Sequence, residues 1–184
     1  MNNTPSLLSI FASLIYLPVA ASAILAASAG RRKGRPQGEA TTWLALAALF
    51  IVLAVSRWFA WEADFHAAMK QAAKARGIYG LRREVQAPLA FGALLAAGAL
   101  SLFMILRVRA ARGAARLCTI ATLGGGVMIS LIALRLLSFH WLDRLLYSGV
   151  RLNWIVDIGS ALGVAACAAA YWRSLADKRR RRRA

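Results

Sequence analysis

The stretch that decides the fold class is WLALAALFIVLAVSRWFAW, residues 43–61. Tryptophans bound it at both ends, and Arg57 is its one charged residue. A helix of about 20 apolar residues crosses the roughly 30 Å hydrocarbon core of a bilayer. Tryptophan is enriched where that core meets the headgroups. The stretch therefore predicts a transmembrane helix.

Four further runs have the same character, and the five together hold most of the hydrophobic residues, which make up 60% of the 184. The charged residues inside these runs are Arg57, Arg135 and Asp157. Apolar runs of this length are typical of membrane spans and not of one soluble core. We therefore expect an all-α integral membrane protein with a single domain over residues 1–184. Its five or so predicted spans are residues 7–29, 43–61, 88–106, 117–137 and 152–172.

The 24 Lys and Arg residues are divided unevenly between the two sides that these spans define. Fifteen lie in the first connection, the third connection and the C-terminal tail. The other nine lie on the opposite side, with five of the seven acidic residues. Because cytoplasmic loops carry the excess of basic residues, we expect the N-terminus outside, the C-terminus in the cytoplasm, and a bacterial inner membrane as the location. A nucleic-acid partner fits the net charge of +17 but not this distribution.

Two segments outside the spans are expected to lie against the membrane surface. Residues 62–76 have an apolar and a polar face at helical spacing, which predicts a short amphipathic interfacial helix on the outer side. Residues 173–184 form a basic cytoplasmic tail that contains Arg179–Arg183. Each basic residue contributes about 1 kcal/mol near anionic lipid, so we expect this tail to bind anionic lipids.

Asp157 is the most unusual polar residue of the predicted spans. A carboxylate about one turn inside the interface is costly unless it is paired. Arg135 lies at a matching depth on the neighbouring antiparallel span, so we predict a structural Arg135–Asp157 ion pair, with Asn153 and His140 nearby. A structural clamp and a substrate or proton site are both compatible with such a pair. Small residues that include Gly159 and Gly163, a GxxxG pair, predict tight contact among spans three to five.

The outer connections resemble a known family in two places. Residues 77–86, GIYGLRREVQ, follow the pattern G-x-Y-x-x-R-R-x-x-Q. Residues 138–143, SFHWLD, and residues 152–159, LNWIVDIG, follow S-F-H-x-x-D and L-N-W-x-x-E/D-x-G. These patterns are similar to those of a family of polytopic inner-membrane proteins of proteobacteria. The resemblance points to the same polar residues but implies no mechanism, since no activity is established for that family.

The sequence predicts a non-enzymatic, accessory membrane protein whose outer polar cluster binds a partner subunit, a lipid headgroup or an amphiphile. The expected binding residues are Tyr79, Arg82, Arg83, Gln86, His140, Asp143, Asn153 and Asp157. One alternative is a membrane enzyme acting on a lipid-linked substrate, with His140 and Asp143 as the acid–base pair. Another is a small dimeric transporter, although the nearly apolar inner halves of the spans offer no polar path.

The expected partners are the bilayer itself and either another membrane protein or a second copy of the chain. Two histidines, and two cysteines within apolar runs, do not form the ligand pattern of a zinc or haem site. The sequence also contains no nucleotide-binding motif. We therefore expect neither a metal nor a cofactor.

Overall fold

The structure, a computed structural model, describes residues 7–59, 68, 71, 82–137 and 152–181. Within these residues the chain is helical almost throughout and contains no strand, which confirms the predicted all-α class. The helices are α1 (Leu7–Arg32), α2 (Gln37–Trp58), α4 (Arg82–Ala110), α5 (Ala114–Leu137) and α7 (Leu152–Arg181).

Four of these helices are long and apolar enough to cross a membrane, counted over the described residues. They are α1, α2, α5 and α7, and they coincide with four of the five predicted spans. The apolar segments are Ser13–Arg32, Gln37–Trp58, Ala114–Ala133 and Trp154–Ala176. The predicted span over residues 88–106 is also helical and lies within α4.

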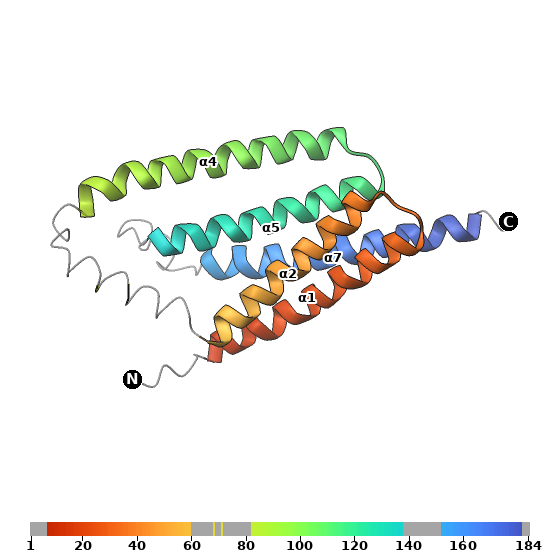
Figure 1. Cartoon of the computed structure of the whole chain (residues 1–184), viewed down its shortest axis with the longest axis horizontal. Helices are drawn as coiled ribbons and strands as arrows, with labels where there is room; N and C mark the ends of the chain where they lie inside the picture. The colour runs from red at the N-terminus through yellow and green to blue at the C-terminus, as the bar shows by residue number, and fades with distance from the viewer. Residues whose placement is uncertain (1–6, 60–67, 69–70, 72–81, 138–151, 182–184) are drawn as a thin grey trace.

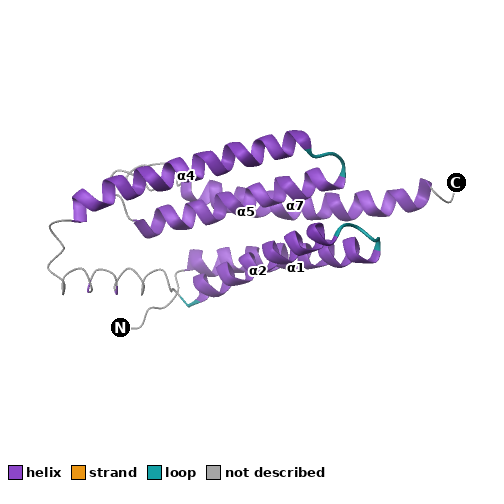
Figure 2. Ribbon diagram, turned by 45° about the horizontal axis from the view of Figure 1, so that its top comes forward, coloured by secondary structure: helices purple, strands orange, loops and turns teal. Residues whose placement is uncertain are grey.

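The four apolar helices form a ring. α1 packs against α2 and α7, and α5 packs against α7 and α2, so each helix has two neighbours. α4 lies outside this ring and packs on α5, as Figures 1 and 2 show. The α1–α2 and α4–α5 connections and the end of α7 share one end of the bundle (Figure 1). We call this the basic end, because thirteen basic residues of the described chain lie there: Arg31, Arg32, Lys33, Arg35, Arg107, Arg109, Arg112, Arg116, Arg173, Lys178, Arg179, Arg180 and Arg181.

The core of the bundle is built mainly from small side chains of α1 and larger ones of α2. On α1 the buried positions recur at intervals of three or four residues, which keeps them on one helical face. They are Ser13, Tyr16, Val19, Ala20, Ala23, Ala26 and Ala27. The alanines of this face let α2 approach closely, and α2 buries Trp43, Leu46 and Phe50 in return.

All five helices are longer than the predicted spans, and α4 and α7 exceed them most. α4 begins at Arg82 rather than at Pro88, and α7 continues through most of the predicted tail to Arg181. Basic side chains near a helix C-terminus interact favourably with the helix dipole, and Ala, Leu, Lys and Arg are good helix formers. The predicted interfacial helix over residues 62–76 lies outside the described residues, apart from positions 68 and 71.

The small-residue prediction is only partly right. α5 does contact both α4 and α7. However, Gly159 and Gly163 are exposed, and a Cβ built on either would meet no atom within 4 Å. The close approaches lie instead on α5, where a Cβ on Gly124 would meet Val164 at 2.9 Å. Within the described part of the chain, neither glycine of the GxxxG pair therefore lies at a close approach to another helix.

Candidate functional site

Asp157 lies near the start of α7, on the face that points into the bundle. Only 4% of the residue is exposed. Its neighbours one and two turns along the same face, Ala161 and Val164, belong to the apolar core. The helical spacing that buries this face therefore also carries the carboxylate inside, where it needs polar partners.

Two other helices supply donors to this carboxylate. The Tyr16 hydroxyl of α1 donates a hydrogen bond to Oδ1 of Asp157. The guanidinium of Arg57, in the last turn of α2, donates from Nη2 to Oδ2 over 3.1 Å. Tyr16 is held in turn by Phe50, whose ring centroid lies 5.7 Å from its own. One carboxylate thus joins α1, α2 and α7, and we call Tyr16, Arg57 and Asp157 the Asp157 cluster.

The Asp157 cluster is shielded from solvent, which strengthens its electrostatics. The side chains of Arg57 and Asp157 are 20% and 6% exposed. At the surface such a pair contributes at most about 1 kcal/mol, whereas removing one partner of a buried pair costs roughly 3–5 kcal/mol. A second bond from Ser13 Oγ to the Ala54 carbonyl, at 3.2 Å, also ties α1 to α2 near this end. The arrangement is that of a clamp between helices.

The sequence identified Asp157 correctly as a residue that needs partners, but it did not identify Tyr16 or Arg57. Arg57 was visible as one of three charges within the spans. Arg57 comes from α2, which is not one of the two neighbours of α7 in the ring, so helix adjacency alone would not have identified it. The side chain of Arg135 is outside the described part, so the Arg135–Asp157 pair stays a prediction.

The other predicted site residues are placed only by their backbones or not at all. Arg82, Arg83 and Gln86 belong to the first turns of α4, and Asn153 is the second residue of α7. These helix starts lie at the same end of the molecule as the Asp157 cluster (Figure 1). The side chains of all four lie outside the described part. Tyr79, His140 and Asp143 lie outside the described residues altogether.

A second polar cluster lies at the basic end, and the sequence did not predict it. Glu39 of α2 accepts two bonds from Arg35, Nη2 to Oε1 at 2.7 Å and Nε to Oε2 at 3.0 Å. The Tyr171 hydroxyl of α7 donates to the same Oε2 at 2.7 Å. The pKa of the Arg35 guanidinium is raised above its ordinary value, chiefly by its hydrogen bond to Glu39. We call Arg35, Glu39 and Tyr171 the Glu39 cluster.

The local fold at the end of α1 positions this cluster. Gly34 has a positive φ of 63°, and the amide of Arg35 donates to the carbonyl of Gly30 at 3.0 Å. The amide of Gly34 donates to the Arg31 carbonyl, which completes a Schellman motif that ends the helix. Gly30 also makes room for α7, because a Cβ there would meet the Tyr171 hydroxyl oxygen at 2.8 Å.

The two clusters repeat one design at opposite ends of the same helices. In each, a carboxylate accepts hydrogen bonds from a tyrosine and an arginine. Glu39 and Arg57 are 18 residues apart on α2, which corresponds to about 27 Å along a helix. That separation is close to the roughly 30 Å hydrocarbon core of a bilayer. The core between them is lined by apolar side chains from α1, α2 and α7.

Within the described residues, no three His, Cys, Asp or Glu side chains are close enough together to hold a metal ion. Cys118 is buried and Cys167 half-buried, and both are free thiols. The expected absence of a cofactor stays a prediction.

Comparison of the chain with protein-family models, with curated proteins and with solved structures found no match.

Proposed function

We propose that this chain is a non-enzymatic accessory protein of the bacterial inner membrane, whose outer polar segments bind a partner subunit, a lipid headgroup or an amphiphile. The observation that carries the proposal is the state of Asp157. Its carboxylate accepts hydrogen bonds from two other helices of the bundle. A carboxylate used in this way fixes the scaffold from which the neighbouring polar segments are presented.

We also infer that α4 is a fifth span and that the basic end faces the cytoplasm. α4 has 29 residues, about 44 Å of helix, which exceeds the thickness of the hydrocarbon core. Its described surface exposes large apolar side chains, among them Phe91, Leu95 and Phe103. The grouping of basic residues at one end supports a cytoplasmic location for that end.

The proposed binding surface comprises the polar residues at and before the starts of α4 and α7. Arg82 and Arg83 provide guanidinium groups suited to a phosphate or a carboxylate, and Asn153 begins the helix that carries Asp157. The remaining residues of the surface are Tyr79, Gln86, His140 and Asp143. The starts of α4 and α7 lie at the end opposite to the basic end (Figure 1), so partner binding there is separable by mutation from charge effects at the basic end.

Purification in mild detergent, followed by mass spectrometry of bound proteins and lipids, tests this proposal. The variant R82Q/R83Q removes two charges from the proposed surface. The control R31Q/R32Q removes two exposed charges from the basic end, on α1. We expect a molecule that accompanies the native chain to be lost from R82Q/R83Q and kept by R31Q/R32Q. A chain recovered without any such molecule, or equal losses in both variants, would contradict the proposal.

The orientation is tested by labelling with a membrane-impermeant maleimide in a chain whose two cysteines are replaced by alanine. Single cysteines at Gln86 and Ser138 should react from outside intact cells, and a single cysteine at Gly113 should react only after the membrane is opened. Reaction of Gly113→Cys from outside would show that the basic end faces outward and would contradict the proposed orientation. If the cysteines at Gln86 and Ser138 were labelled from opposite sides, the five-span arrangement would be wrong.

A further inference from the structure

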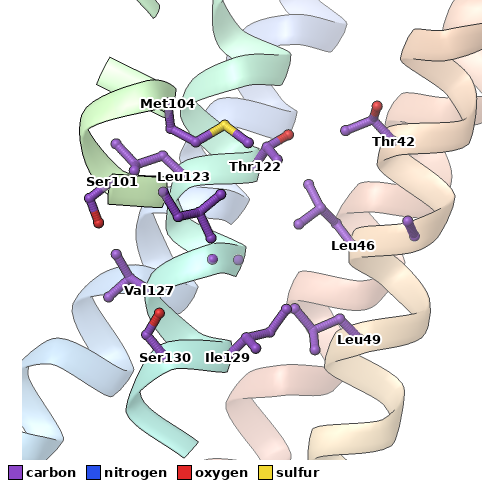
Figure 3. Close-up of a pocket in the computed structure, with 14 residues that line it drawn as sticks. Thr42, Leu46, Leu49, Ser101, Met104, Thr122, Leu123, Val127, Ile129 and Ser130 are labelled. Carbon is purple, nitrogen blue, oxygen red and sulfur yellow. The ribbon is translucent and has the colours of Figure 1, made fainter. Parts of the chain in front are cut away.

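A cavity of about 290 Å³ lies between α2, α4 and α5. It exists because α2 and α4 both pack on α5 while α4 stays outside the ring, and it is partly open to the surroundings of the bundle. Figure 3 shows side chains from all three helices around it. The lining includes Leu46 and Leu49 of α2, Ser101 and Met104 of α4, and Thr122 and Ser130 of α5.

The long dimension of this cavity matches one leaflet of a bilayer. Along α5 the lining runs from Thr122 to Ser130, eight residues or about 12 Å. Half of a hydrocarbon core is about 15 Å. On α2 the lining begins at Thr42, three residues after Glu39 of the cluster at the basic end, and reaches Leu49 near the middle of the helix. On α5 the lining begins at the ninth residue of the helix and passes its middle, so the cavity runs from the half of the bundle nearer the basic end past the middle of α5.

The cavity has apolar walls with few polar groups. The Thr122 hydroxyl donates to the Cys118 carbonyl and the Thr42 hydroxyl to the Gly38 carbonyl, so these hydrogens are used within their own helices. An apolar cavity of this kind excludes water and takes apolar ligands. In a chain surrounded by lipid, a hydrocarbon chain is the group that fits such a wall.

Positive charge is concentrated where α4 and α5 meet at the basic end. The α4–α5 connection and its flanks carry four exposed arginines: Arg107, Arg109, Arg112 and Arg116. Arg107 lies one turn beyond Met104 of the cavity wall, with its guanidinium carbon 5.1 Å from the Phe103 ring centroid. Residues 85–142 contain no acidic side chain that could neutralise these charges. Guanidinium groups beside an apolar slot suit a phosphate ester that carries an acyl chain.

We propose that this cavity holds one acyl chain of an anionic phospholipid whose phosphate is bound by the arginines of the α4–α5 connection. The charge selects an anionic headgroup, and the position of the arginines at the basic end places that headgroup in the leaflet at this end. This site is distinct from the outer binding surface and does not depend on it. A lipid bound there fills the cavity between α2, α4 and α5 and supports the packing of α4 on the ring.

Glycines of the structure provide a matched pair of variants. Gly126 lines the cavity, and a Cβ built on it meets no atom within 4 Å, so the side chain of Gly126→Leu starts in open space and extends into the cavity. Gly163 on α7 is equally open but lies away from the cavity. Gly163→Leu therefore adds the same atoms to a lipid-facing helix without blocking the site. Ser101→Leu fills the cavity from α4 and serves as a second blocking variant.

The test reconstitutes the full chain in mixed vesicles of phosphatidylethanolamine and phosphatidylglycerol, extracts it in mild detergent, and counts the retained lipids by native mass spectrometry. We expect the native chain and Gly163→Leu to retain one phosphatidylglycerol in preference to phosphatidylethanolamine. Gly126→Leu and Ser101→Leu should lose it. R109Q/R112Q should lower the preference for the anionic lipid by up to about 30-fold.

Three results would overturn the proposal. The first is equal retention of both lipids by the native chain. The second is full retention of phosphatidylglycerol by both blocking variants, with helix content and monodispersity unchanged. The third is a native dimer that Gly126→Leu converts to a monomer without any change in bound lipid, since the cavity would then be covered by a second copy of the chain.

Discussion

The substitution Asp157→Asn removes the negative charge from the Asp157 cluster while keeping the shape of the side chain. The asparagine oxygen can still accept from the Tyr16 hydroxyl, so the main loss is the ion pair with Arg57 at 3.1 Å. A fully buried pair loses roughly 3–5 kcal/mol when one partner is removed, and an exposed one at most about 1 kcal/mol. With side chains 20% and 6% exposed, we expect a loss of about 2–3 kcal/mol. For a chain of this length that lowers Tm by about 5–10 °C.

The assay is thermal unfolding of the purified chain in one detergent, followed by helix content, for D157N, R57Q and the double variant. Because the two residues share one interaction, we expect the double variant to lose less than the sum of the single losses, with a coupling of about 0.5–3 kcal/mol. A parallel cycle with R135Q measures the predicted Arg135–Asp157 pair. R173Q, at an exposed position of α7, is the control and should leave Tm nearly unchanged. Unchanged Tm in both D157N and R57Q, or strictly additive losses, would refute the clamp.

Three further predictions concern the rest of the bundle and use the same thermal assay or thiol labelling. Tyr171→Phe removes a hydrogen bond to a carboxylate and should cost about 1.5–3 kcal/mol; an unchanged Tm would show that the Glu39 cluster adds no stability. Gly30→Ala puts a methyl 2.8 Å from the Tyr171 hydroxyl and should destabilise by about 1–3 kcal/mol, whereas Gly98→Ala meets nothing within 4 Å and should stabilise by about 0.4–1 kcal/mol. Equal effects of the two glycine variants would contradict the close approach of α1 and α7. The Cys118 thiol, 6% exposed, should react with a small maleimide much more slowly than Cys167 until the chain is unfolded in dodecyl sulfate; equally fast reaction in the folded chain would show that Cys118 is accessible.

Hydropathy alone was sufficient to predict the positions of the helices. Lipid offers no hydrogen bonds to the backbone, so an apolar run of this length within a membrane has to form a helix. The ends of α4 and α7 were less predictable. Polar residues beyond the hydrocarbon core continue a helix or leave it at similar cost, so Arg82 and Arg181 could not be read as boundaries from hydropathy alone.

The hydrogen-bond partners of Asp157 and Glu39 could not be predicted from the sequence. The cost of burying Asp157 indicated that partners were needed, but not which helix would supply them. Tyr16 is 141 positions away and Arg57 is 100 positions away, and only the ring of helices brings them together. The hydrogen bond between Tyr171 and Glu39 was even less predictable, because polar residues near span ends are common. Their pairing also depends on the close approach of α1 and α7 that Gly30 allows.

The two carboxylate clusters also set a length scale that the surrounding bilayer has to match. Each cluster satisfies its own charges, yet both gain from contact with headgroups and water, and they are about 27 Å apart along α2. A thicker bilayer would draw one of them into hydrocarbon, whereas a thinner one would expose apolar side chains to water. Hydrophobic mismatch of this kind costs fractions of a kcal/mol per ångström. In a bundle whose four apolar helices cross a bilayer, the positions of one glutamate and one aspartate thereby favour a membrane of matching thickness.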